Sequence, residues 1–220
     1  MKIYTAIPSR NPSNDPHIYG NVEGDTAAKK YQRILDDFVA NHGDHDWLNI
    51  IHEDAYLISD PTRELEKLPE NVGVAGVIGS MFLGPSLQWW QNPPMVCCGH
   101  LLQGLDTPPY QREMRERGLP GTHWNMATVD GFCLLIRRDF AEKIHMSDLG
   151  STWHLYDVDI CIQARLSGHD VGIIDVETFH RSPGNFDPND FEAARKKFVD
   201  RWKEPVDKSA CLPYNLGGIQ

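Results

Sequence analysis

Residues 47–54 read WLNIIHED, an apolar run followed at once by a histidine and two acidic residues. A short apolar run of this kind is typical of a strand buried on both faces of a parallel sheet. In such sheets, ligands collect at the carboxyl ends of the strands. The stretch therefore predicts a buried strand and, directly after it, a candidate site at His52, Glu53 and Asp54.

The segments on either side of this strand alternate between helix and strand patterns. Residues 27–39 carry apolar side chains at helical spacing, with Thr26 or Asp25 as the N-cap and Gly43 as the stop. Asp60-Pro61 begins a second helix at 62–68. With strands at 3–8 and 72–78, this order predicts a parallel α/β sheet with crossover helices.

The rest of the chain continues the pattern after one interruption. Residues 79–126 are rich in Pro, Gly, Trp and Gln, and we expect irregular structure with short elements there, serving as a lid or substrate loop. Regular patterning then predicts strands within 127–136 and 171–176, and helices at 140–144, 156–166 and 191–202. Because there are no repeats or linkers, we expect residues 1–220 to form a single domain.

Composition narrows the functional classes. The 220 residues carry 31 acidic and 21 basic side chains, a formal net charge of −10, which argues against broad binding to a nucleic-acid backbone. The five cysteines form no metal knuckle or disulfide framework, so reduced thiols and a cytoplasmic location are expected. Residues 71–105 are uncharged, but their prolines would break a spanning helix, so no membrane anchor is expected.

Further acidic and imidazole groups could join the candidate site. Asp157 and Asp159 lie in the first turn of the helix at 156–166, where capping is the simpler explanation of a carboxylate. Their side chains point to nearly opposite sides, so one faces a given cavity, and Asp157 is the preferred general base. His180, just after the last strand, is either structural or completes a cation site with Asp54. Oxygen-rich ligands suit Mn²⁺ or Mg²⁺, which would bridge a diphosphate.

Two other features could contact a substrate. Asp130-Gly131 precedes an apolar strand and is either a simple turn or a place where substrate approaches the backbone. Trp89 and Trp90 are either core residues or flat faces for stacking a sugar or base. The chain has no P-loop, dinucleotide, serine-hydrolase or zincin motif.

Five segments together resemble the family 2-like glycosyltransferases of the GT-A fold. The resemblance covers most of the chain apart from much of the 79–126 region. It implies an α/β fold with one GT-A-like domain, in which helices flank a central, mostly parallel sheet. In chain order the segments are 3–11 (IYTAIPSRN), 49–57 (NIIHEDAYL), 129–137 (VDGFCLLIR), 156–172 (YDVDICIQARLSGHDVG) and Phe179-His180.

The resemblance also implies a role for each matching residue. Asp157 would be the catalytic base, and Asp54 and His180 would hold the metal. His52 stands at the first position of the family's D-x-D motif, a departure that leaves the usual ribose contact open. The substrate contacts implied or suggested are Pro8, Ser9, Arg10, His52, Glu53, Asp130 and Gly131, with Trp89 and Trp90 from the aromatic segment.

The expected activity is a metal-dependent, inverting transfer of a hexosyl or pentosyl group from a nucleotide-sugar donor, with UDP favoured, to a hydroxyl acceptor. The acceptor is a soluble glycan, a protein, a small molecule or a hydroxymethylated base in phage DNA. DNA would need a local basic strip, for which Arg112, Arg115 and Arg117 are candidates. The alternatives are a nucleotide-sugar-binding module without turnover and a metal-dependent phosphohydrolase or nucleotidyltransferase. The oligomeric state is left open.

Overall fold

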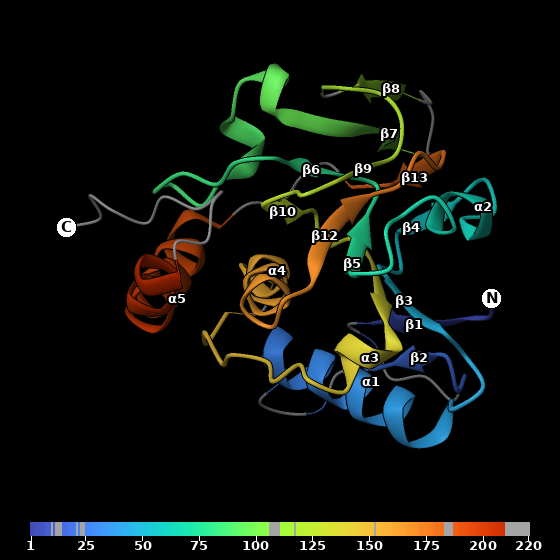
Figure 1. Cartoon of the computed structure of the whole chain (residues 1–220), viewed down its shortest axis with the longest axis horizontal. Helices are drawn as coiled ribbons and strands as arrows, with labels where there is room; N and C mark the ends of the chain where they lie inside the picture. The colour runs from blue at the N-terminus through green and yellow to red at the C-terminus, as the bar shows by residue number, and fades with distance from the viewer. Residues whose placement is uncertain are drawn as a thin grey trace.

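The computed structural model describes residues 1–9, 11, 15–20, 22, 25–105, 111–116, 118–151, 153–182 and 187–209, with backbone alone for 105, 111–116 and 207–209. Strands form two sheets, and helices pack around the larger one (Figure 1). Among these residues, no helix is long and apolar enough to cross a bilayer.

The larger sheet has seven strands in the order β2-β1-β3-β11-β5-β12-β9. Five strands run in one direction, and β11 and β9 run against them, so the predicted mostly parallel sheet is confirmed. The bounds are β1 Ile3–Pro8, β2 Ile18–Tyr19, β3 Trp47–Ile51, β5 Val72–Gly76, β9 His123–Trp124, β11 Cys133–Arg137 and β12 Asp170–Ile173.

Side chains of the central strand β3 alternate between two hydrophobic clusters. Leu48 and Ile50 belong to the cluster under helix α1, whereas Trp47 and Ile51 belong to the cluster that faces the second sheet. All five residues of β3 are buried, as expected for a strand covered on both faces.

The helices lie where the sequence predicts them, with shifted ends. Thr26 caps α1 by accepting a hydrogen bond from the Lys29 N–H, while Asp25 forms an ion pair with Arg33 instead. Helix α4 begins and ends at the predicted residues and packs on β5 and β12. The helices are α1 Ala27–Asn41, α2 Thr62–Leu65, α3 Arg138–Ala141, α4 Tyr156–Leu166 and α5 Pro188–Ser209, with 3-10 turns η1 Trp89–Gln91 and η2 Pro94–Val96.

The second sheet is the main departure from expectation. The segment predicted as one strand at 72–78 divides at Val77, so β5 stays in the larger sheet while β6 pairs in the second. The 79–126 segment, expected to be irregular, contributes the nine-residue strand β7, which pairs with β6, β8 and β13. Local patterning did not indicate β7 because its partners are mostly distant in sequence. The strands are β4 Ala55–Leu57, β6 Ile78–Ser80, β7 Cys97–Leu105, β8 Gln111–Glu116, β10 Thr128–Val129 and β13 Thr178–His180.

Candidate functional site

Three chain segments meet where the central strand β3 ends. His52 and Asp54 follow β3 directly, and the N–H of His52 donates a hydrogen bond of 2.9 Å to the carbonyl of Phe132, just before β11. Strand β13 pairs with β4 so that His180 lies opposite Ala55. The sheet topology therefore brings residues 52, 54, 132 and 180 together from distant parts of the sequence.

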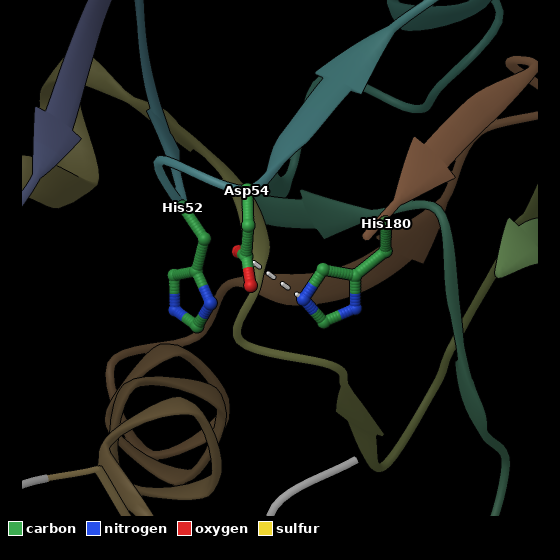
Figure 2. Close-up of side chains that lie close together, drawn as sticks. All are labelled: His52, Asp54 and His180. Carbon is green, nitrogen blue, oxygen red and sulfur yellow. Dashed lines mark ion pairs between the residues drawn. The ribbon is translucent and has the colours of Figure 1, made fainter. Parts of the chain in front are cut away.

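His52, Asp54 and His180 form a cluster that could hold a metal ion. One ligand atom from each lies within 4.8 Å of the others, and no other such group occurs in the parts of the chain that the structure describes. Figure 2 shows the Asp54 carboxylate between the two imidazole rings. The donor set of two imidazoles and one carboxylate fits a first-row divalent cation.

Asp54 and His180 also form an ion pair. Nε2 of His180 lies 3.5 Å from Oδ1 of Asp54, and the side chains are 16% and 34% exposed, respectively. This contact with His180 is the main cause that lowers the pKa of Asp54. The His180 ring stacks on Phe132 with 4.5 Å between centroids, which fixes its plane. The cluster is thus partly open to solvent and preformed.

His52 is supported from behind by two buried tyrosines. Its Nε2 lies 2.9 Å from the hydroxyl of Tyr156 and 3.4 Å from that of Tyr31. The two phenol rings pack with their centroids 4.4 Å apart. The imidazole orientation is therefore set by neighbours on α1 and α4.

Asp130 and Asp157 form a second acidic group beside the cluster. The Gly131 N–H donates to Oδ2 of Asp157 at 3.1 Å, and the Phe132 N–H donates to Oδ1 of Asp130 at 3.3 Å. Burial and the nearby Asp130 charge raise the pKa of Asp157 to about 7, and burial raises the pKa of Asp130. A carboxyl group with a pKa near neutrality is suited to accept a proton in catalysis.

Asp159 has a structural environment. Its side chain is fully buried, and its carboxylate accepts hydrogen bonds from the N–H and Oγ of Ser147, from Gln163 and from Nε1 of Trp202. The bonds from Ser147 and Trp202 connect α4 to the segment before it and to α5, whereas the bond from Gln163 lies within α4. By contrast, Asp157 is only partly buried, so the structure separates the two carboxylates that the sequence left as alternatives.

Ser9 and Glu53 line the adjoining end of β1. Oγ of Ser9 donates to Oε2 of Glu53 at 2.6 Å, and the buried ammonium of Lys30 donates to the Ser9 carbonyl at 2.8 Å. Lys30 also lies over the ring of Trp153 at 5.2 Å. Pro8 is the last residue of β1, and Arg10 lies outside the described residues.

Gly131 packs closely against Tyr156. A Cβ at this position would collide with the Tyr156 hydroxyl and ring, so the missing side chain makes room for Tyr156. The sequence pattern did not indicate this because the two residues are 25 positions apart. The expected contact of Gly131 with a substrate stays a prediction.

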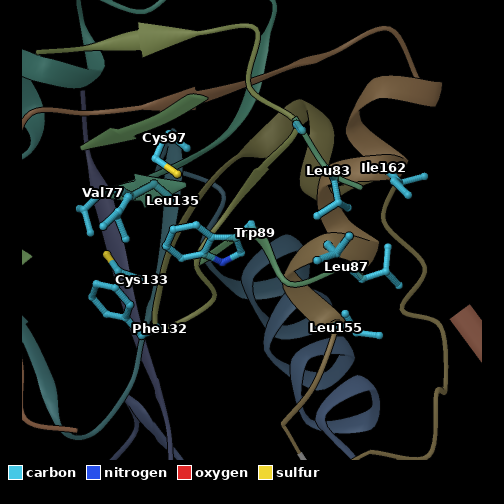
Figure 3. Packing of buried hydrophobic residues seen from close by; sticks show 14 of the residues in the cluster. Val77, Leu83, Leu87, Trp89, Cys97, Phe132, Cys133, Leu135, Leu155 and Ile162 are labelled. Atoms are coloured by element: carbon cyan, nitrogen blue, oxygen red, sulfur yellow. The ribbon is translucent and has the colours of Figure 1, made fainter. Parts of the chain in front are cut away.

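The two adjacent tryptophans divide between core and surface. Trp89 is buried in the larger hydrophobic cluster, and Figure 3 shows Leu83 and Leu87 on one side of its ring and Leu135 and Phe132 on the other. Trp89 therefore corresponds to the core alternative, and its faces are not available for stacking. Trp90 remains 37% exposed and has its edge toward Phe191.

Sequence reasoning missed several side chains that shape the site: Lys30, Tyr31, Phe132, Trp153 and Tyr156. Each of these residues lies within or next to an apolar helix or strand pattern, and such a pattern does not indicate a functional site. A polar atom on a predicted buried face, as in Tyr31, was the one available signal, because buried polar groups require partners. The basic strip cannot be placed, since the side chains of Arg112 and Arg115 and all of Arg117 lie outside the described part.

The chain was compared with protein-family models, solved structures and curated proteins. The family model described as "Glycosyltransferase like family" matches residues 38–202. Among solved structures, the crystal structure of A197 from STIV superposes with a TM-score of 0.48 at 16% identity, covering 83% of this chain and 86% of that one. A search of curated proteins finds no match.

Proposed function

The chain belongs to the glycosyltransferase-like family, and on that premise we propose that it is a metal-dependent, inverting glycosyltransferase that uses a nucleotide-sugar donor. The α/β architecture agrees with a single GT-A-like domain. The observation that most supports the proposal is a link between two groups: a three-residue donor set for a cation, and a carboxyl group whose pKa is about 7. Tyr156 directly precedes Asp157, and its hydroxyl lies 2.9 Å from Nε2 of His52 in the donor set.

The proposed roles follow from the positions of the side chains. Asp54 and His180, with His52 beside them, would hold Mn²⁺ or Mg²⁺, which when bound neutralises the charge on a leaving diphosphate. Asp157 accepts the proton of the acceptor hydroxyl as that oxygen bonds to the anomeric carbon. The bond from the anomeric carbon to the diphosphate oxygen breaks, and the nucleoside diphosphate leaves with the electron pair. The Gly131 N–H holds the Asp157 carboxylate in place, and burial and the Asp130 charge raise the pKa of Asp157.

The donor side of the site is proposed at the end of β1. Ser9 and Glu53 present a hydroxyl and a carboxylate there, and Lys30 adds a positive charge next to the Ser9 carbonyl. Hydroxyl, carboxylate and ammonium groups are suited to a ribose and a diphosphate. We propose that the donor is a UDP-sugar and that the protein acts in the cytoplasm on an acceptor that carries a hydroxyl group. The acceptor classes to screen are glycans, proteins and hydroxymethylated DNA bases.

The direct test measures which product forms from which donor. Nucleotides and their sugars are first screened by thermal shift with and without Mn²⁺, because a ligand that binds the native state raises Tm. The donor identified is then incubated with an acceptor library, and the released nucleotide is quantified. Metal-dependent release of a nucleoside diphosphate with a glycosylated acceptor supports the proposal.

Three other outcomes would contradict it. Release of inorganic phosphate or pyrophosphate indicates a phosphohydrolase or nucleotidyltransferase. Donor binding without turnover across the acceptor classes indicates a binding module. Equal activity after removal of divalent cations by a chelator contradicts the metal dependence.

A further inference from the structure

His52 occupies the first position of the acidic motif, yet its ring belongs to the metal-binding cluster. A ring nitrogen of His52, a carboxylate oxygen of Asp54 and a ring nitrogen of His180 all lie within 4.8 Å of one another. We infer that His52 is a third ligand of the proposed cation and that Tyr156 is the positioning residue that aims it. This inference rests on the metal dependence proposed above and specifies the ligand set and the metal preference.

The two nitrogens of His52 face different surroundings. Nε2 is within 2.9 Å of the Tyr156 hydroxyl, on the side of α4. Figure 2 shows the other ring nitrogen on the side of Asp54 and His180. In the tautomer with its proton on Nε2, the ring donates to Tyr156 and the Nδ1 atom carries the lone pair that would bind a cation. A ligating histidine characteristically donates its second N–H to an oxygen in this way.

The Tyr156 hydroxyl is held in place on its other sides. Its side chain is 5% exposed, and that of Tyr31, which is hydrogen-bonded to it, is fully buried. The ring fills the space beside Gly131, where even a methyl group would collide with it. Since a buried hydroxyl without a partner costs free energy, the His52 contact is part of a packed arrangement and is not an incidental surface contact.

This ligand set has a consequence for the choice of metal. Mg²⁺ prefers oxygen ligands, whereas imidazole nitrogens suit later first-row divalent metals. Two imidazoles and one carboxylate therefore favour Mn²⁺, Co²⁺ or Zn²⁺ over Mg²⁺. An aspartate in place of His52 would shift the preference toward Mg²⁺.

The test measures metal binding without donor or acceptor. Mn²⁺ affinity is determined by titration calorimetry and by the loss of the free Mn²⁺ electron paramagnetic resonance signal, with Mg²⁺ as a competitor. The proteins are the wild type and the variants Asp54→Ala, His52→Ala, His52→Asp and Tyr156→Phe. Tyr4→Phe is the matched control, because Tyr4 is also buried and has its hydroxyl near that of another tyrosine, Tyr19.

We expect the wild type to bind Mn²⁺ more tightly than Mg²⁺. His52→Ala and Tyr156→Phe should each weaken Mn²⁺ binding by about 10- to 100-fold, whereas Tyr4→Phe should leave it unchanged. His52→Asp should reduce the preference for Mn²⁺ over Mg²⁺. A purely structural role for Tyr156 would alter the stability of Tyr156→Phe but leave its Mn²⁺ affinity as in the wild type.

The experiment distinguishes a failure of the proposed metal dependence from a failure of the inference about His52. If the wild type binds no divalent cation, both the proposed metal dependence and this inference are wrong. If Asp54→Ala abolishes Mn²⁺ binding while His52→Ala keeps the wild-type affinity, the metal site stands and the inference is overturned. Should Tyr156→Phe fail to fold, His52→Ala and His52→Asp still decide whether His52 is a ligand.

Discussion

Asp157 and Asp159 are two positions apart on α4, yet their carboxylates lie in opposite environments. The Asp157 side chain is partly exposed and receives the Gly131 N–H, whereas Asp159 is enclosed by Ser147, Gln163 and Trp202. Residues two apart on a helix point in nearly opposite directions, so a single turn places one carboxylate in the core and leaves the other partly exposed.

Asp157→Asn should lower turnover by about 100-fold or more while donor affinity stays near that of the wild type. The amide cannot accept the acceptor proton, but it keeps the volume of the side chain. The measurements are kcat with the identified donor and acceptor, and donor Kd by calorimetry. Asp36→Asn, an exposed change on α1, is the control, and full activity in Asp157→Asn would rule out Asp157 as the base.

Asp159→Ala should destabilise the protein by about 3 kcal/mol, because it leaves buried donors on Ser147 and Trp202 without their acceptor. Urea unfolding of the metal-free protein gives this free energy directly. Asp36→Ala is again the matched control. A loss of stability no larger than that of the control would show that the four hydrogen bonds contribute little.

The raised pKa of Asp157 predicts how activity depends on pH. The base must be ionised, so kcat/KM should rise with pH through about 7. Because the Asp130 charge is one cause of the raised value, Asp130→Asn should move this midpoint to lower pH. A pH-rate profile of the wild type and Asp130→Asn tests this. An unchanged midpoint would show that the Asp130 charge does not raise the pKa of Asp157.

The same shift has a consequence for stability in the metal-free protein. The pKa of Asp157 is higher in the folded state than the usual 3.8, so between these values the folded protein keeps a proton that the unfolded chain has released. The stabilisation from this group is present below pH 3.8 and is lost as pH rises to about 7. Asp157→Asn should therefore flatten the pH dependence of the unfolding free energy in that window. Parallel curves for the two proteins would contradict the raised pKa.

Gly131→Ala should destabilise the protein by about 2 kcal/mol, since the new methyl group would meet the Tyr156 ring and hydroxyl at contact distances that require a shift. Denaturant unfolding measures the loss. Gly43→Ala is the control, because nothing lies within 4 Å of the Cβ that would be added there. Equal stability of the two variants would mean that Tyr156 can move without cost.

The sequence predicted the local structure well where side-chain periodicity carries the information. Helix α4 has the predicted bounds, α1 begins at the predicted residue, and β3 lies where its apolar run indicated. The acidic motif after β3 was located by the general rule that ligands gather at the carboxyl ends of parallel strands. The single-domain organisation and the roles of Pro8, Ser9, Glu53 and Trp90 stay predictions.

Contacts between distant residues were decided by the tertiary structure. Strand β7 is stabilised by pairing with β6 and β13, and Trp89 is buried because of what packs around it, so neither could be inferred from local patterning. The sequence by itself determined which helices and strands form and which carboxylates follow them, because periodicity and capping are local. Only the folded chain decided that His52 lies near His180, that the Tyr156 hydroxyl contacts His52 and that Asp159 rather than Asp157 is enclosed in the core. These relationships depend on packing between elements far apart in the sequence.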